Sequence, residues 1–222
     1  MSNAPKIIDL KTWDRRNTYQ WFKDFDYPYF VVGAELDITA ALPYFKQQQL
    51  SPYLCLIYAA CKTANQMPSF RQRMRGTGIH EQVVEHECIH ANFTVPKMDS
   101  KAENTFAIKL AEYQSDFRKF YASTSDTHAL AEINPNETPD VSDHWLFISC
   151  LPWVSFTHIT QPVTRKSGSI PRIVWGKFTP RGEQILLPIS VQAHHSLLDG
   201  IHVGQYLQNF QRMLSEPHIS FK

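Results

Sequence analysis

The sequence has little net charge, since 22 Lys and Arg residues nearly balance 21 Asp and Glu residues. Proteins that bind nucleic acid or an acidic membrane surface usually carry a clear excess of basic residues on one face. The near balance therefore gives no electrostatic reason to expect either partner.

The sequence also lacks a long hydrophobic run. It has no stretch of 18 apolar residues and no basic segment followed by an apolar one near the N-terminus. Those patterns are typical of membrane-spanning helices and secretory leaders, so we expect no membrane partner. Met1-Ser2-Asn3-Ala4 looks like a tag remnant, and we expect a single domain over residues 5–222.

Cysteine is scarce, with four residues in 222. Cys55, Cys61, Cys88 and Cys150 lie in apolar surroundings with no tight pairing in the sequence. We predict that they are reduced packing residues and that the protein is cytoplasmic.

Strand and helix patterns alternate along the rest of the chain and predict a mixed α/β domain. Strands are expected over residues 28–38, 70–75, 82–95, 105–109, 145–160, 172–178 and 184–193, and helices over 39–49, 53–67, 111–122 and 201–214. Ser51-Pro52 is typical of a helix start, and Pro188 predicts a bulge or a locally unpaired strand edge. Residues 126–143 are the best candidate for a long loop.

Two histidine motifs compete for a functional reading. His86 and His90 fit the HExxH pattern of zinc proteases, which requires both side chains on one helical face. Their flanks are rich in β-branched residues, however, and on a strand the two would stand ~13 Å apart. Ligands ~2.1 Å from one metal cannot be separated so far, so we expect no metal and interpret both histidines as strand residues facing solvent or an interface.

The second motif, HHSLLDG, follows an apolar strand and precedes an amphipathic helix. Adjacent residues of a strand face opposite sides, so at most one of His194 and His195 faces any given pocket. Asp199 could be only the N-cap of the following helix, and His195 only a polar turn residue. The position of the motif on a connecting turn nevertheless favours a functional role.

The residues around this motif resemble the chloramphenicol acetyltransferase family. QAHHSLLDGIHVGQYL is close to the active-site signature of that family. Further resemblances occur in order along nearly the whole chain, in WDRR (13–16), ISCLPWV (148–154), GKF (176–178) and LLPISVQ (186–192). HHxxxDG alone also occurs in the dihydrolipoamide acyltransferases of 2-oxo acid dehydrogenase complexes, whereas the set of pieces is more specific.

The resemblance implies a two-layer α/β sandwich, a homotrimer with active sites between subunits, and acetyl-CoA as a co-substrate with no permanently bound cofactor. The acceptor would be a hydroxyl of a small, mostly apolar molecule such as chloramphenicol or a related xenobiotic, so that the family role is antibiotic resistance. Carried over by position, His195 is the general base, Ser149 supplies a hydroxyl near the acyl group, and Asp199 pairs with Arg16 without forming a triad. Lys177 and Phe178 are expected to contact CoA.

Aromatic residues near the N-terminus are the expected walls of the acceptor pocket, namely Phe22, Phe25 and Tyr29, with Tyr19 a further candidate; ordinary core packing is the alternative for each. Four residues depart from those we expect in the family, namely Ala193, Ile201, Pro96 and Val174. We expect these differences to change the acceptor pocket and to leave the catalytic groups intact. Two other functions stay open: a dihydrolipoamide acyltransferase core, although no lipoyl domain or Ala/Pro-rich tether is present, and a catalytically silent trimeric binding protein.

Overall fold

The computed structural model describes residues 4–96, 106–130, 142–164 and 168–222. The main sheet has the strand order β2-β10-β8-β7-β5-β6, with β9 paired to β10. Its strands are β2 (Tyr29–Asp37), β5 (His90–Pro96), β6 (Phe106–Ala111), β7 (Trp145–Leu151), β8 (Arg172–Gly176), β9 (Thr179–Arg181) and β10 (Gln184–His194). A smaller sheet, which the sequence did not predict, joins β1 (Lys6–Ile8), β4 (Gln82–Glu85) and β3 (Gln72–Arg75).

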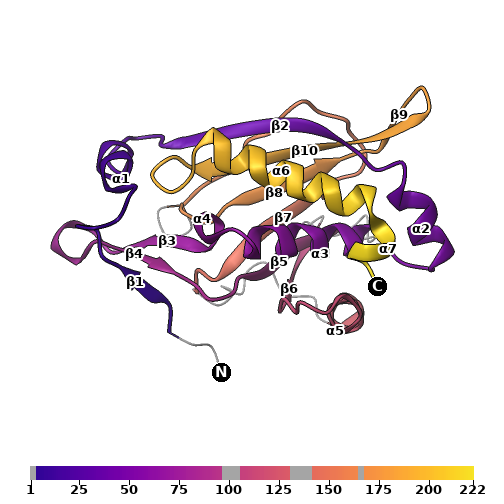
Figure 1. Ribbon diagram of the computed structural model, residues 1–222, viewed down its shortest axis with the longest axis horizontal. Coiled ribbons are helices and arrows are strands. Elements are labelled where there is room, and N and C mark those ends of the chain that lie inside the picture. The colour runs from indigo at the N-terminus through magenta and orange to yellow at the C-terminus, as the bar shows by residue number, and fades with distance from the viewer. Residues whose placement is uncertain (1–3, 97–105, 131–141, 165–167) are drawn as a thin grey trace.

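Helices cover one face of the main sheet, which gives the predicted two-layer sandwich (Figure 1). The helices are α1 (Arg16–Phe22), α2 (Ala41–Gln47), α3 (Pro52–Asn65), α4 (Pro68–Arg71), α5 (Phe117–Leu130), α6 (Gly200–Ser215) and α7 (Pro217–Ser220), with a short 3₁₀ turn η1 (Gly78–His80). The β5–β7 and β7–β8 pairs are parallel and the other pairs are antiparallel. The mixed sheet confirms the predicted fold class.

The helices α3 and α6 form where the apolar pattern predicted them, whereas the helix expected over 111–122 is α5, which begins only at Phe117. α3 begins at Pro52 as expected, although the Ser51 side chain makes no capping hydrogen bond. Along α6, Val203, Leu207, Phe210 and Leu214 are buried, and the helix packs on β2 and α3. Burial of this stripe stabilises the fold by about 25 cal/mol for each Å² of apolar surface that is removed from water.

Pro188 sits inside β10 where the strand changes neighbours. On one side it pairs in register with Glu35 of β2. On the other side β9 pairs only up to Leu186 and β8 begins at Ile189. Proline lacks an N–H to donate, and the gap between β9 and β8 leaves that edge locally unpaired, as predicted.

Several predicted boundaries are wrong. The strand expected over 82–95 is two strands in different sheets, and Phe70 lies in α4 rather than in a strand. The strand expected over 145–160 ends at Leu151, and residues 152–164 form neither helix nor strand. The expected loop 126–143 begins inside α5, which runs to Leu130; residues 131–141 lie outside the described part, as does most of the proposed tag remnant.

The HExxH segment comprises the link between β4 and β5 together with His90, the first residue of β5, so it offers no helical face for two metal ligands. His86 is buried and its Nε2 lies 2.8 Å from Asp143, which also accepts two hydrogen bonds from Arg75. The Nδ1 of His90 accepts the Tyr113 N–H at 2.9 Å. Each histidine thus bonds a neighbouring segment through a ring nitrogen. His86 is buried and follows β4, so it is not the solvent-facing strand residue that was expected, whereas His90 is half-buried at the start of β5 and its place at an interface stays a prediction.

All four cysteines are free thiols. Cys55 and Cys61 are buried in the core, as predicted, and burial raises the pKa of Cys55 to about 12. Cys88 and Cys150 are only half-buried.

Candidate active site

His195 lies on the turn that joins β10 to α6. Its N–H donates to the Pro28 carbonyl at 2.8 Å, which ties the turn to the start of β2. The imidazole is stacked on the Phe22 ring, with centroids 4.1 Å apart and planes 2° apart, and Phe30 contacts it at 4.8 Å. The side chain is about a third exposed, yet its Nδ1 is buried. Exchange of a proton with a bound molecule would therefore have to use Nε2.

His194 has a different environment. It is buried, meets Tyr29 edge-on at 5.1 Å, and its Nδ1 accepts the Ser196 N–H at 3.2 Å. Burial, followed by the neighbouring His195, lowers the pKa of His194 to about 4. The two neighbours thus lie in separate surroundings, as the strand geometry predicted.

Asp199 pairs with Arg15, which corrects the prediction of Arg16. Arg15 Nη2 donates to Asp199 Oδ1 at 3.0 Å, and Nη1 bonds the second carboxylate oxygen. The same guanidinium donates to the carbonyls of His195 (2.9 Å) and Ser196 (3.3 Å). Arg16 instead donates to the Lys11 carbonyl at an exposed position. Arg15 therefore holds the histidine turn through both backbone and side chain.

Asp199 is also the N-cap of α6, where His202 completes a capping box by accepting the Asp199 N–H at 2.9 Å. Its Oδ1 lies 3.2 Å from His195 Nδ1, but without hydrogen-bond geometry. Hydrogen bonds from Arg15 are the main reason that the pKa of Asp199 lies below its usual value. The carboxylate thus combines the two readings left open by the sequence, a cap and an ion-pair partner.

The three residues predicted to line the acceptor pocket do not all lie beside the same histidine. Phe22 lies against His195, and Phe25 packs on Phe22 with centroids 5.1 Å apart. Tyr29 meets His194 rather than His195, so within one chain it does not border the exposed imidazole. Tyr19 is fully buried in the core.

Ser149 lies on β7, on the sheet face opposite the helices. Its Oγ is 2.9 Å from Thr94 Oγ1 of the adjacent strand β5. It borders a hollow formed by side chains of β5, β6, β7 and β8 and by the segment after β7, including Asn92, Thr94, Phe106, Ile108, Phe147, Trp153 and Arg172. Polar and aromatic groups thus surround the hydroxyl.

Ser149 and His195 do not meet within one chain. In the sheet register, Ser149 pairs with Val174, and Val174 pairs with Ser190. His195 follows five positions beyond Ser190, about 16 Å along the strand at ~3.3 Å per residue, and two strand spacings of ~4.8 Å separate β7 from β10. One acyl group cannot touch both side chains of a single chain.

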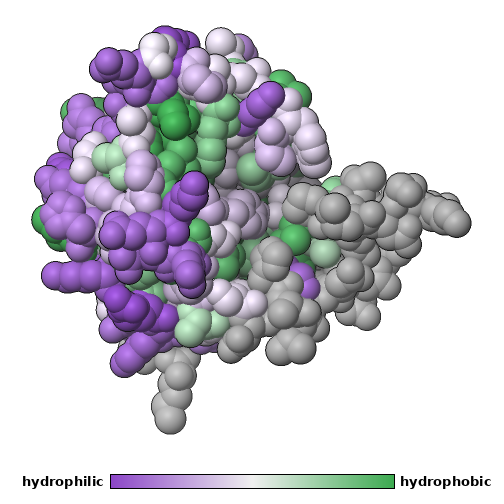
Figure 2. Space-filling model, turned by 90° about the vertical axis from the view of Figure 1, so that its right-hand side faces the viewer, coloured by the Kyte–Doolittle hydropathy of each residue, from purple (hydrophilic) through white to green (hydrophobic). Residues whose placement is uncertain are grey.

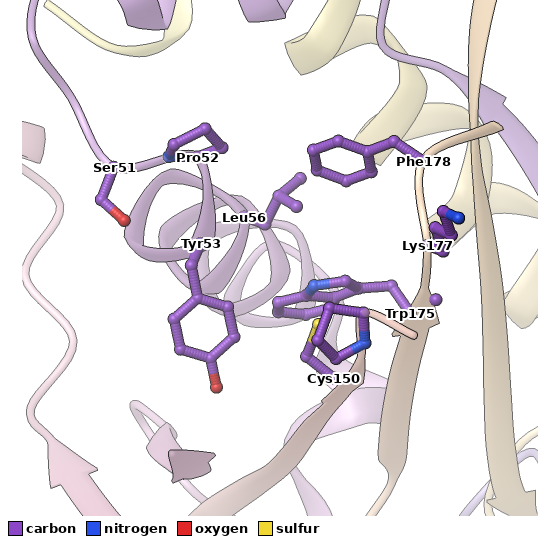
Figure 3. Close-up of a pocket in the computed structure, with 10 residues that line it drawn as sticks. Ser51, Pro52, Tyr53, Leu56, Cys150, Trp175, Lys177 and Phe178 are labelled. Carbon is purple, nitrogen blue, oxygen red and sulfur yellow. The ribbon is translucent and has the colours of Figure 1, made fainter. Parts of the chain in front are cut away.

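Lys177 and Phe178 lie at a cavity of about 480 Å³ between the start of α3 and the end of β8. Figure 3 shows Phe178, Leu56 and Trp175 around this space, with the Tyr53 hydroxyl pointing away from Phe178. Lys177 is exposed, whereas the rest of the lining is mainly apolar.

Figure 2 views the molecule from the end that carries α2, α7 and β9 and shows a strip of hydrophobic side chains among hydrophilic ones.

Four residues of the site were missed from the sequence: Arg15, Phe30, Thr94 and His202. Arg15 stands in the WDRR motif beside the predicted arginine, and His202 in the histidine motif itself, so both carried a signal. Phe30 and Thr94 reach the site only through strand pairing. Among the expected departures, Val174 and Ala193 are buried and Ile201 is 67% exposed.

The fold and the histidine turn define an acyltransferase architecture. A solved chloramphenicol acetyltransferase superposes with a TM-score of 0.84 at 26% identity, covering 95% of this chain and 100% of that one. A dihydrolipoamide acetyltransferase of Azotobacter vinelandii shares the fold with a TM-score of 0.67 at 14% identity.

Sequence comparison gives the particular family. The chloramphenicol acetyltransferase profile matches residues 4–211. A chloramphenicol acetyltransferase of Escherichia coli is 28% identical over 94% of this chain and 93% of its own length, and one of Streptomyces acrimycini is 29% identical over 96% of each. The chain belongs to the chloramphenicol acetyltransferase family.

Two further findings bear on partners. No helix in the described part of the chain combines the length and hydrophobicity needed to cross a bilayer. Within those same residues, no group of three or more His, Cys, Asp or Glu side chains is arranged to hold a metal ion.

Proposed function

We propose that this protein transfers the acetyl group of acetyl-CoA to a hydroxyl of a small, mostly apolar acceptor, with His195 as general base. The observation that carries the proposal is the state of the His195 ring. Phe22 covers one ring face, Arg15 fixes the turn, and Nδ1 is buried. A ring held in this way presents Nε2 in one direction, which is what a general base requires.

The chemistry follows from the weakness of the acceptor. A hydroxyl is a poor nucleophile near neutral pH, and a neutral imidazole, with an ordinary pKa of about 6.5, can take its proton as it attacks the thioester carbonyl. Ser149 donates a hydrogen bond to the resulting oxyanion; loss of one such donor commonly lowers the rate by ~10²–10³. The imidazolium then returns the proton to the departing CoA thiolate, and no acyl-enzyme forms.

Acetyl-CoA enters as a co-substrate rather than as a bound cofactor. The apolar cavity beside Phe178 suits the pantetheine arm, and the exposed ammonium of Lys177 suits a phosphate at its mouth. Cys150 lines both this cavity and the hollow that Ser149 borders, so the two spaces are neighbours, and in the proposed complex the thioester end of the arm lies near this hydroxyl.

The acceptor site lies between subunits of a homotrimer. Because Ser149 and His195 are far apart within one chain, a shared site lets His195 of one subunit face Ser149 and the acceptor pocket of its neighbour. Phe22, Phe25 and Tyr29 line this site in the proposed assembly. Chloramphenicol is the first acceptor to test, and the family role in antibiotic resistance follows if it is accepted.

The test is release of the CoA thiol from acetyl-CoA with a panel of hydroxyl and amine acceptors. The wild-type protein should acetylate a hydroxyl compound. His195→Ala should lower kcat by several orders of magnitude with the fold intact, and the matched variant His194→Ala should remain far more active. An inactive His194→Ala beside an active His195→Ala would contradict the assignment, and transfer to amines alone would exclude the proposed acceptor class.

A further inference from the structure

The hydroxyls of Thr94 and Ser149 form a pair between two parallel strands. Phe93 and Ile148 pair in register and both are buried on the helix-covered face. Alternation along each strand therefore places the next residues, Thr94 and Ser149, on the opposite face. Their oxygens lie 2.9 Å apart, a normal distance for a hydrogen bond between hydroxyls.

Thr94 is the flanking residue that can serve Ser149 as a donor. On its other side Ser149 pairs in register with Val174, whose side chain has no hydroxyl. Thr94 is itself fixed, because the Tyr53 hydroxyl donates to its carbonyl oxygen. Tyr53 also lines the apolar cavity beside Phe178, whereas Thr94 lines the hollow next to Ser149, so this hydrogen bond joins the linings of the two spaces.

A hydroxyl has one proton and two lone pairs, so the direction of this hydrogen bond decides what Ser149 can do. If Ser149 donates to Thr94, its proton is occupied and cannot reach a ligand. If Thr94 donates, the Ser149 proton is free to point into the hollow. A hydroxyl that accepts one hydrogen bond also becomes a better donor.

We propose that Thr94 is a positioning residue that donates to Ser149 and so directs the Ser149 proton at the acyl oxygen. The inference rests on the proposed acetyl transfer, in which Ser149 faces the developing oxyanion. Neither hydroxyl gives up its proton; the acceptor proton passes to His195 and then to the CoA thiolate. Thr94 therefore acts on the transition state through Ser149 and contributes little to ground-state binding.

The experiment compares hydroxyl-free and hydroxyl-bearing variants in the acetyl-CoA assay. Thr94→Val and the smaller Thr94→Ala should lower kcat about tenfold, with both KM values within about twofold of the wild type, while Thr94→Ser should recover most of kcat. In a Ser149→Ala background, Thr94→Val should have less than about a twofold further effect, because the hydroxyl it serves is absent. Thr63→Val is the matched control, since Thr63 lies near the far end of α3 from Tyr53 and its buried hydroxyl bonds the Met213 sulfur at 3.6 Å.

The outcomes separate this inference from the proposed function. Wild-type rates in Thr94→Val, equal losses in Thr94→Ser and Thr94→Val, or the same loss with and without Ser149 would each overturn the role of Thr94 and leave acetyl transfer in place. A wild-type protein that acetylates no hydroxyl compound would overturn the proposed function and this inference together.

Discussion

At the scale of single residues, Arg15 decides how the histidine turn is held. It bonds Asp199 and two carbonyls of the turn, with 14% of its side chain exposed against 35% for Asp199. In its degree of burial the pair is intermediate between two cases. An exposed ion pair stabilises a protein by ~0–1 kcal/mol, whereas loss of one partner of a buried pair costs ~3–5 kcal/mol. We expect Arg15→Met to lower the free energy of unfolding by about 1–3 kcal/mol and kcat by at least about tenfold.

Arg16 provides the matched control, because it is the next residue and, within the described part of the chain, its side chain donates to the Lys11 carbonyl and not to Asp199. A double-mutant cycle by chemical denaturation should give a coupling above about 1 kcal/mol between Arg15→Met and Asp199→Asn, and none between Arg16→Met and Asp199→Asn. Additive effects in the first cycle would mean that Asp199 acts only as the cap of α6.

His194 predicts a stability change with pH. Its pKa is about 4 in the folded protein and about 6.5 when exposed, so between these values the unfolded chain binds the extra proton. The free energy of unfolding is therefore unaffected by His194 above about pH 6.5. It decreases as the pH falls towards 4, by on the order of 3 kcal/mol in total. Denaturation curves over this range should show a smaller loss for His194→Gln than for the wild type, and an unchanged loss for the exposed His218→Gln. Equal losses in all three proteins would contradict the assignment.

At the scale of elements, the segment 152–164 is fixed to the sheet by side chains of β10. Ser190 and Gln192 alternate with core residues and bond the backbone of Ile159 and Gln161, with Gln161 N–H donating to Gln192 at 2.6 Å. Two residues before Ile159, the segment lies so close to β2 that a Cβ built on Gly33 would stand 1.8 Å from the Thr157 carbonyl oxygen. The segment thus forms the wall of the Ser149 hollow that carries Trp153.

Gly33→Ala should therefore displace this segment. Inserting an extra methyl into a tight contact costs typically ~1–3 kcal/mol, and we expect that loss in unfolding free energy together with a lower kcat. Gly204→Ala is the matched control, because a Cβ at this position meets nothing within 4 Å. Replacing a glycine inside α6 with alanine should stabilise the protein by roughly 0.5–1 kcal/mol. Equal stability of the two variants would mean that the segment tolerates displacement.

At the scale of the whole molecule, the separation of Ser149 from His195 predicts a shared site. If each site takes His195 from one subunit and Ser149 from the next, inactive His195→Ala and Ser149→Ala chains should restore activity when they are denatured together and refolded as mixed trimers. Random assembly gives about a quarter of the sites an intact pair, so about a quarter of wild-type activity is expected. The chains refolded separately and then mixed are the control.

Sedimentation provides the second measurement at this scale. The active species should have about three times the 25.7 kDa mass of one chain. An active monomer, or no recovery in the mixed refolding, would contradict the shared site.

The sequence by itself determined the fold class and the family. Period-2 and period-3.6 apolar patterns are local, so the long elements α3, α6, β2 and β10 could be predicted from them. The histidine motif indicated the functional turn, because its residue types stand at short spacing between a strand and a helix, whereas Ser149 came only from the resemblance to the family and its role stays a prediction. Pro188 marked a gap in pairing because its missing N–H is a property of one residue.

Only the tertiary structure decided which side chains meet. Arg15 immediately precedes α1 and Arg16 is its first residue, so their side chains leave the backbone in different directions, and which of them meets Asp199 depends on how α1 lies against the turn. Thr94 reaches Ser149 through the parallel register of β5 and β7, across 55 residues of sequence. Residues 82–95 divide between two sheets, and the link between the two strands is held from other segments, because Asp143 bonds the His86 ring and Arg71 donates to the His86 carbonyl. Such contacts depend on packing between elements, which no local pattern encodes.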